Sequence, residues 1–517
     1  MTPKFYNIQA LLTIVAAASL LIGINALGDG VTSKLKVHVP TGLSKAGGYE
    51  HREALFGVPP YGGAIIEKVY FADDRMCDDK YDAFGGYPER ENDANGNDVP
   101  WQTPFILMIE RGGCTFVQKV RNAQRAGAAA VIIADMLCQC KYDDLCHSEP
   151  NVECEGLEPT MADDGSGADI SIPSFLMFKQ DADPVKATLM SNNPVRMELR
   201  WSVPNPGPSV SYELWTTPTD TISEEFQLDF KEAALALGGT SSFTPHMFIY
   251  DGYISGCFSG SGGGENVCDN LCTNNGRYCA TDPDGDLDTG VSGSDVVRES
   301  LRRLCIWDQY GGDGIGKEWW DYVDYFINSC ISEFFTDREC IMDAMQQSNI
   351  DIGAVEQCMS DSGGLEEDKI NARLALEIKA KEDDGVVILP VAYVNGAAIR
   401  GALEFSTMFK AVCSGYKSGT QPEICDRCSL CPHEKECVER GYCTALPGSK
   451  AVVSKSYFMW SIVVIIVSFA GIAFAGYTYH QKRMRSQIRG ILAEYMPIDK
   501  EGNLHDTAID ADDAEFS

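Results

Sequence analysis

A short loop in the first third of the chain carries residue types suited to holding a peptide. It consists of Arg111, Gly112, Gly113, Cys114, Thr115 and Phe116. The two glycines lack Cβ atoms and lead into a predicted helix, so free backbone N–H groups are expected to face outward. Such a loop can bind a peptide carbonyl or carboxylate without any catalytic side chain. A tight turn that simply requires two glycines is the alternative interpretation.

Two clusters elsewhere offer ligand types that metal ions accept. The first alternates around Gly285 and comprises Asp282, Asp284, Asp286 and Asp288. An EF-hand loop would need glycine at its sixth position and glutamate at its twelfth, where Leu287 and Gly293 stand. Calcium binding is one interpretation of this cluster, and a solvated acidic turn is the favoured one. The second cluster is interpreted as disulfides rather than a metal site and comprises Cys138, Cys140, Cys146 and Cys154.

The sequence pattern provides no catalytic set. The seven histidines show neither a zinc-helix motif nor metal-ligand spacing, and no serine, histidine and aspartate set stands out. No Cys-x-x-Cys pair stands at the head of a helix, where the pKa of a thiol would be lowered. The run Cys425-x-x-Cys428-x-x-Cys431 lies in a short loop-rich segment instead. We therefore expect a protein that is not an enzyme and that has no cofactor, the calcium ion considered above excepted.

The peptide-holding loop is expected to connect a strand to a helix. Phe105 to Ile109 is an apolar run of strand length, and Ala129 to Ala134 is a second one. Between them Thr115 can cap a helix, with Gln118 completing a capping box and Gly127 at its left-handed end. This order predicts parallel strands with a right-handed crossover. Further strands are expected at Leu35–Val39, Ala64–Phe71, Ile172–Met177 and Val195–Trp201.

Both ends of the chain bear on membrane topology. Residues 1–26 read as a signal peptide, with Lys4 before an apolar stretch. Residues 457–479 carry no charge and are long enough to cross a bilayer. Basic residues follow this span at Lys482, Arg483, Arg485 and Arg489. The positive-inside rule therefore predicts a cytosolic tail at residues 480–517 and a lumenal N-terminus.

The positions of the cysteines indicate the redox compartment of each part of the chain, and the net charge limits the classes of ligand that it could bind. All 20 cysteines lie between Cys77 and Cys443. This distribution matches an oxidising lumen before the span and a reducing cytosol after it. The net charge of −33 argues against nucleic acid, whose phosphates would repel such a surface. The same charge permits basic peptide ligands and supplies carboxylates that protonate as a compartment acidifies.

A second domain is expected after a stiff proline-rich linker at residues 204–208. Its predicted elements are a strand at Tyr212–Trp215, a helix at Phe226–Leu237, a strand at His246–Tyr250, a helical insertion over residues 294–380, strands at Val386–Leu389 and Val391–Val394, a turn at Asn395-Gly396 and a helix at Phe405–Cys413. Strand, proline, strand, Asn-Gly hairpin and helix are typical of the C-terminal half of a thioredoxin fold, with Pro390 at the cis-proline position. Helix-to-helix disulfides are expected in the insertion from Cys305, Cys330, Cys340 and Cys358.

Two sets of motifs resemble one known family. The block ERGGCTF…NAQRAGAAAVIIAD is similar to the protease-associated (PA) domain of vacuolar sorting receptors. The motifs YELWT, FTPH, WWDYV, VVILP, RGALE and QPEIC keep the order and approximate spacing of the same receptors. The resemblance implies a multidomain α/β fold. Its parts would be a PA domain at residues 27–203, a thioredoxin-like domain with a helical, disulfide-rich insertion at 204–420, a Cys-rich stalk at 421–449 and one transmembrane helix at 457–479.

The resemblance also implies a function. In these receptors an RG-x-C-x-F loop contacts cargo, which implies cargo binding by Arg111 to Phe116. The tail carries a segment similar to the family's YMPL signal, which comprises Tyr495, Met496, Pro497 and Ile498. A tyrosine and a bulky aliphatic residue so spaced can fill two pockets on a clathrin adaptor medium subunit. The implied protein is a type I membrane receptor of Golgi, trans-Golgi network and prevacuolar or endosomal membranes that sorts soluble cargo to the vacuole or lysosome.

The sequence differs from plant members of that family in two features. Thr219 to Glu225 lacks the cysteine pair of the plant members, and only Cys425 to Cys443 stands where they carry epidermal-growth-factor-like repeats.

The main alternative function is a thioredoxin-like oxidoreductase or chaperone of the secretory pathway, which the missing Cys-x-x-Cys disfavours. A membrane-anchored protease or ubiquitin ligase would also carry a PA domain, but a ligase needs cytosolic RING cysteines, and the tail has no cysteine.

Overall fold

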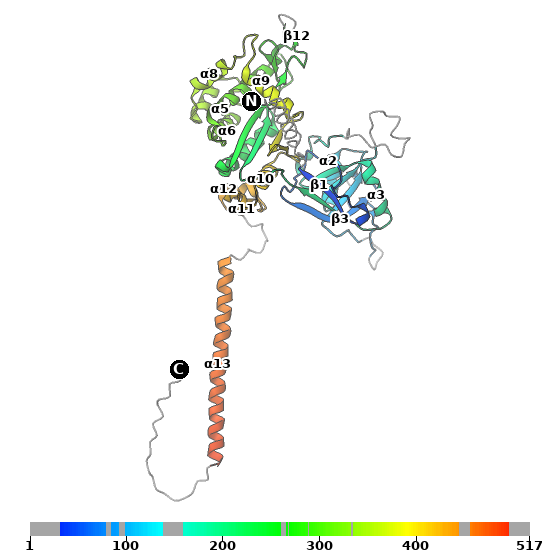
Figure 1. Cartoon of the computed structure of the whole chain (residues 1–517), viewed down its shortest axis with the longest axis vertical. Helices are drawn as coiled ribbons and strands as arrows, with labels where there is room; N and C mark the ends of the chain where they lie inside the picture. Colours follow the sequence, from blue (N-terminus) through cyan, green and yellow to red (C-terminus); the bar gives the residue numbers. More distant parts are fainter. Residues whose placement is uncertain are drawn as a thin grey trace, which may run out of the picture. The chain divides into compact units, whose positions relative to one another are not determined.

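The computed structural model describes residues 32–78, 84–92, 99–137, 159–259, 265–266, 268–287, 289–331, 334–443 and 455–495 (Figure 1). It divides into two units, Met1–Thr444 and Ala445–Ser517. The predicted signal peptide and the cysteine cluster from Cys138 to Cys154 lie outside the described residues. Single-turn 3-10 helices occur at Thr41–Leu43, Gly167–Asp169, Gly238–Thr240 and Asp269–Leu271.

The first part of the chain forms a mixed sheet of eight strands. Its order is β1-β8-β3-β5-β6-β7-β2, with β4 paired to β3. The strands are β1 Ser33–Val39, β2 His51–Glu53, β3 Ala64–Ala72, β4 Gly86–Tyr87, β5 Phe105–Glu110, β6 Ala128–Ala134, β7 Ser174–Met177 and β8 Val195–Trp201. The four central strands β3, β5, β6 and β7 run parallel, as the predicted strand–helix–strand unit requires.

Helices cover both faces of this sheet. α2 (Phe116–Arg125) packs on the face that presents Leu107 and Ile109, whereas α3 (Lys179–Met190) packs on the face that presents Ile106 and Met108. Alternate residues of β5 therefore face different helices, and Phe105 to Ile109 are all buried. This explains why Phe105 to Ile109 is a continuous apolar run rather than an alternating one. The prediction of a strand, helix and strand over residues 105–134 is confirmed.

The second part contains a thioredoxin-like sheet of order β10-β9-β16-β17. Its elements are β9 Val210–Thr216, α4 Thr221–Leu237, β10 Ser241–Met247, β16 Val391–Val394, β17 Ala397–Ala398 and α10 Phe405–Ser414. Small antiparallel pairs lie between β10 and the insertion: β11 Tyr250–Asp251, β12 Phe258–Ser259, β13 Glu265–Asn266, β14 Cys272–Thr273 and β15 Tyr278–Cys279. The Asn395-Gly396 turn has positive φ at both residues, 51° and 76°, as a two-residue hairpin requires.

The predicted helical insertion is confirmed and is cross-linked. It comprises α5 Gly293–Tyr310, α6 Lys317–Ser329, α7 Arg338–Gln347, α8 Ile352–Asp361 and α9 Ala372–Asp383. Cys305 on α5 is bonded to Cys358 on α8, and Cys330 at the end of α6 is bonded to Cys340 on α7. The expectation of helix-to-helix bridges therefore holds.

Two predicted strands differ from the structure. The strand placed at His246–Tyr250 runs from Ser241 to Met247 instead, because it pairs in parallel with the whole of β9. Val386–Leu389 is not a strand, and Val387 is 83% exposed. β16 pairs with β9 from Val391, opposite Trp215, and β9 ends at the next residue, so the preceding segment has no strand to pair with. Leu389–Pro390 is a cis peptide, as its predicted position implies.

The segment expected to be a loop-rich, Cys-rich stalk is folded against the thioredoxin-like domain over its described part. It forms α11 (Glu423–Cys428) and α12 (Glu434–Arg440), and Cys413–Cys425 joins it to α10. Lys435 on α12 pairs with Asp229 on α4 at 2.5 Å. Disulfides Cys428–Cys437 and Cys431–Cys443 close it internally. This compact packing corrects the sequence-based picture, since cysteine spacing does not reveal what a short helix packs on.

The PA and thioredoxin-like parts are joined by backbone hydrogen bonds. The N–H groups of Gly401 and Ala402 donate to the carbonyls of Ala54 and Gly57, at 3.0 and 2.8 Å. The Arg400 N–H donates to the Tyr61 hydroxyl at 2.8 Å. The RGALE motif is therefore a contact with the first domain.

The second unit contains one long helix, α13 (Lys455–Tyr495). Within it, Ile462–Ser486 is long and apolar enough to cross a membrane. The predicted span at residues 457–479 thus lies within one helix and overlaps the candidate membrane span over residues 462–479. Tyr495 is the last residue of α13, because the helix continues past the apolar span through the basic stretch. Met496, Pro497 and Ile498 lie outside the described residues.

Candidate peptide-binding site

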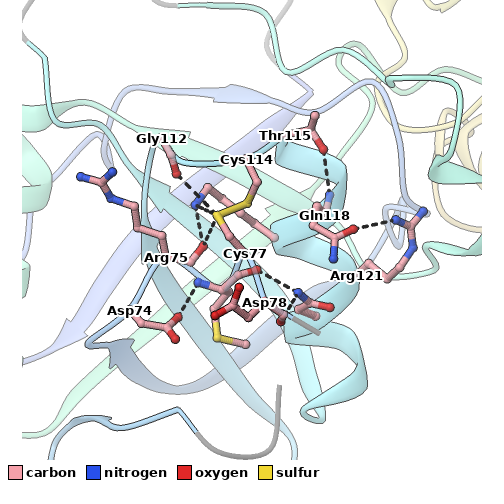
Figure 2. The surroundings of a disulfide bond; sticks show 12 residues. Asp74, Arg75, Cys77, Asp78, Gly112, Cys114, Thr115, Gln118 and Arg121 are labelled. Atoms are coloured by element: carbon pink, nitrogen blue, oxygen red, sulfur yellow. Dashed lines mark hydrogen bonds between the residues drawn. A yellow bond between two sulfur atoms is a disulfide. The ribbon is translucent and has the colours of Figure 1, made fainter. Parts of the chain in front are cut away.

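The glycine loop follows β5 and leads directly into α2 (Figure 2). Gly112 and Gly113 have φ values of 98° and 89°, in the region that side chains with a Cβ rarely adopt. A Cβ on Gly113 would also approach Cys77 Sγ to 3.0 Å. Both glycines are thus required by the backbone, which is the tight-turn interpretation. That requirement is compatible with ligand binding, because Gly113 is exposed at the surface.

A disulfide fixes the loop from one side. Cys114 is bonded to Cys77, which lies in the segment after β3. Sequence spacing left the pairing of Cys114 open. The bond joins two connections that both follow strands of the parallel sheet, and such connections lie at the same edge. The loop is therefore anchored at Cys114 as well as at its strand and its helix.

Two polar residues of α2 lie beneath the disulfide. The Lys119 ammonium donates to the Arg75 carbonyl at 2.5 Å and lies 3.6 Å from Cys77 Sγ, and Asn122 Nδ2 donates to the carbonyls of Met76 and Asp78 at 2.9 Å. Both side chains are fully buried. Burial, followed by the charge of Arg75, lowers the pKa of Lys119 to about 8. Sequence analysis missed both residues, because lysine and asparagine at this helical spacing resemble a solvent face.

Arg111 is held in an ion pair. Its Nη1 donates to both carboxylate oxygens of Asp135, at 3.2 and 3.1 Å. The Asp135 side chain is only 1% exposed, whereas that of Arg111 is 24% exposed. A guanidinium carries five N–H donors, and this pair engages one of its nitrogens. Asp135 therefore orients Arg111 at the rim of the loop.

A second arginine, Arg75, lies beside the loop. A Cβ on Gly112 would be 3.7 Å from the Arg75 guanidinium. Arg75 is exposed, and Figure 2 shows its side chain directed away from the disulfide. Arg75 is distant from Arg111 in the sequence and was not predicted as a site residue. Its position two residues before Cys77 was the only sequence feature that could have indicated a role at the site.

Where the loop joins α2, Thr115 caps the helix, and two aspartates, Asp164 and Asp169, lie close by. Thr115 accepts a hydrogen bond from the Gln118 N–H at 3.2 Å, so the predicted N-cap is observed. The Gln118 side chain instead accepts from Arg121. Hydrogen bonds from Ser166 and Thr115 lower the pKa of Asp164, and hydrogen bonds from Arg121 lower that of Asp169. Both carboxylates therefore stay ionised between pH 7 and 5. Phe116 packs against the core beneath α2.

The acidic cluster that was considered for calcium belongs to the thioredoxin-like part of the chain rather than to the glycine loop. Asp282, Asp284 and Asp286 lie in an exposed turn, where carboxylates of Asp282 and Asp284 accept backbone N–H groups of the same turn. Asp288 lies outside the described residues. Among the described residues every cysteine is in a disulfide, including Cys257, which is bonded to Cys268. No described cysteine stands between β9 and α4, so that part of the thioredoxin-like domain carries no thiol.

Comparisons with known proteins agree with this architecture. A model of the vacuolar sorting receptor thioredoxin-like domain matches residues 210–413, and a PA domain model matches residues 67–185. The chain is 33% identical over 430 residues to vacuolar-sorting receptor 1 of Pisum sativum, covering 80% of this chain and 63% of that relative. It is 31% identical over 467 residues to vacuolar-sorting receptor 4 of Arabidopsis thaliana, covering 87% of this chain and 69% of that relative.

The matches in length and in solved structures are more limited. The chain spans 63% of the length of the Pisum sativum relative. A solved structure of a Wolbachia pipientis alpha-DsbA1 variant aligns with 41% of this chain and 86% of that chain at 12% identity. Its TM-score of 0.24 is too low to carry an argument.

Proposed function

Because the chain belongs to the vacuolar sorting receptor family, we propose that it is a single-pass membrane receptor that sorts soluble proteins from the Golgi to the vacuole or lysosome. The one helix in the described residues that is long and apolar enough to cross a membrane supports the anchoring. The lumenal part would bind cargo, and clathrin adaptors would bind the cytosolic tail. This function needs no catalysis and no cofactor.

The site for the cargo peptide is the loop from Arg111 to Phe116. The observation that carries this assignment is a rigid glycine loop with two arginines beside it. A disulfide and a capped helix hold the backbone, and Asp135 orients Arg111. Arg75 adds a second exposed guanidinium next to Gly112. Arginine donors and glycine backbone can grip the carbonyls and carboxylates of an extended peptide.

The test is capture of cargo by the full chain in lipid nanodiscs. Proteins bound from secretory lysate at pH 7 would be eluted at pH 5 and identified, and peptides from their sorting regions would then be titrated. Arg111→Ala should weaken peptide binding at least tenfold, a loss of about 1.4 kcal/mol. Arg196→Ala, which removes an exposed arginine of β8, is the matched control. Equal affinities for the two variants would reject the loop as the site.

Release of the cargo peptide in acidic compartments would follow from protonation of carboxylates on the receptor. Asp164 and Asp169 keep their charge in this range, so they are not the groups that respond. Peptide affinity should fall between pH 7 and 5. An affinity that is the same at both pH values would exclude acid release.

Adaptor binding is assigned to the tail from Tyr495 to Ile498. Replacing Tyr495 by Ala should move the steady-state location of the protein from Golgi and endosomal membranes to the cell surface or vacuole. An unchanged location would reject the signal. Protease protection tests the orientation, because residues 480–517 must be digested in intact vesicles if the tail is cytosolic.

A further inference from the structure

A cleft in the helical insertion is distinct from the glycine loop. It has a volume of about 410 Å³ and lies between α5, α7 and α8. This volume falls within the range of sites that bind ligands in proteins. The elements that line it belong to the thioredoxin-like part, whereas the glycine loop belongs to the PA part.

The floor of the cleft is apolar and contains three methionines. Ile341, Met345 and Val355 are buried there, and Met342 and Met359 are the other two methionines that line it. Methionine side chains have three rotatable bonds and a polarizable sulfur, so they adjust to apolar groups of different shape. A surface of this kind accepts one apolar side chain among several alternatives.

The rim of the cleft presents arginines. Arg298 and Arg302 lie one turn apart on α5, and Arg338 lies across the cleft on α7. Arg298 pairs with Glu366 at 2.8 Å, and Arg338 pairs with Glu356 at 3.2 Å. Each of these pairs is largely exposed. Exposed pairs are worth little, so a ligand carboxylate can replace Glu366 or Glu356 at small cost.

The other acids at the rim already have partners inside the protein. Glu299 accepts from Arg303 Nε at 3.0 Å and from the Tyr322 hydroxyl at 3.1 Å, and it also pairs with Arg302. Asp295 accepts the Ser292 N–H at 3.1 Å in the capping box of α5. Glu356 and Glu366 are therefore the exposed acids with which a ligand carboxylate competes for the guanidiniums of Arg338 and Arg298.

Disulfides fix the walls of the cleft. Cys305–Cys358 joins α5 to α8, and Cys330–Cys340 joins α7 to the end of α6. Two walls are thus tied directly to each other, and the third is tied to the neighbouring helix. A fixed frame with an adjustable lining lowers the ordering cost of binding while tolerating ligands of different sequence.

We propose that this cleft binds a peptide segment in which an apolar side chain is flanked by carboxylates. The apolar side chain occupies the methionine floor, and the carboxylates pair with Arg298 and Arg338. This second peptide site is independent of the glycine loop and does not rest on the sorting role.

The test uses the full chain in lipid nanodiscs and a fluorescein-labelled peptide, GSEDLFDEGS, followed by fluorescence anisotropy. Two control peptides replace either the acids (GSQNLFNQGS) or the apolar pair (GSEDSSDEGS). Arg298→Glu combined with Arg338→Glu should weaken binding of the first peptide at least tenfold. Arg440→Glu reverses an exposed arginine on α12, outside the cleft, and should change the affinity less than twofold. Both control peptides should bind at least tenfold more weakly than the first.

A second readout is independent of the arginine variants. In methyl NMR of the wild-type chain, the peptide should shift the methyl signals of Met342 and Met359 and leave that of Met484 on α13 unchanged. Arg111→Ala should leave the affinity for this peptide unchanged, which separates this site from the proposed cargo loop. The proposal is overturned if the wild type shows no saturable binding up to about 1 mM, if the double charge reversal binds within twofold of wild type, or if Arg111→Ala abolishes binding.

Discussion

At the scale of single residues, Lys119 is unusual because a buried ammonium holds the loop from below. Its folded pKa of about 8 is lower than the ordinary value of 10.5. Between these two values the unfolded chain binds a proton that the folded chain does not. The folded state is therefore penalised fully below pH 8, and its stability rises as the pH increases towards 10.5.

This linkage predicts a difference between Lys119→Met and the wild type. Over the range from pH 7 to 10.5 the wild type should gain roughly 3 kcal/mol relative to the variant, since a shift of one pKa unit corresponds to about 1.4 kcal/mol. Urea unfolding of both chains at several pH values measures it. Lys45→Met, which removes a half-exposed lysine, should keep the wild-type dependence. A Lys119→Met chain with the wild-type slope would show that Lys119 is not titrating.

The conformation of Gly113 gives a second prediction at this scale. Gly113→Ala must adopt a φ of 89° and place its Cβ 3.0 Å from Cys77 Sγ. Gly165→Ala must adopt a similar φ of 87° but meets nothing within 4 Å. The control should lose about 1 kcal/mol from backbone strain alone, and Gly113→Ala about 2–3 kcal/mol once steric crowding is added. Equal shifts in the urea midpoint would mean that the disulfide moves aside without cost.

At the scale of elements, the Cys77–Cys114 bond joins two strand-ending loops that carry the proposed site. Its sequence separation of 37 residues implies a stabilisation of about 4 kcal/mol in the chain-entropy account. Replacing both cysteines by Ala should lower stability by a similar amount and weaken binding of cargo peptides. Replacing Cys257 and Cys268, which close an 11-residue separation away from the loop, should lower stability without changing peptide affinity. An unchanged cargo affinity in the variant without Cys77–Cys114 would mean that the loop does not need this disulfide in order to bind.

At the scale of the whole molecule, the RGALE motif joins the PA and thioredoxin-like parts. Gly401 has a φ of 91°, and a Cβ there would lie 2.3 Å from Pro59 Cδ and 2.8 Å from the Gly57 carbonyl. Gly401→Ala should therefore separate the two parts and speed proteolysis in the connection at residues 204–208. Gly419→Ala has a φ of 84° and meets nothing within 4 Å, so it should leave the cleavage rate unchanged. Identical rates for both variants would mean that other contacts hold the parts together.

The sequence alone determined the elements whose signals are local. The buried strands beside the glycine loop, the Thr115 cap, the Asn395-Gly396 hairpin and the apolar membrane helix all follow from periodicity or turn chemistry within a few residues. It also placed the chain in its family through motifs that keep their order. These features needed no knowledge of distant contacts.

Only the tertiary structure decided what depends on pairing between distant residues. It brought Arg75 and Cys77 beside a loop that is distant in the sequence, placed Lys119 and Asn122 under the disulfide, and folded α11 and α12 onto α4 and α10. It also left Val386–Leu389 unpaired, because β9 ends before this segment could join it. Burial and pairing of this kind are set by the whole packed chain, so residue type and spacing cannot reveal them.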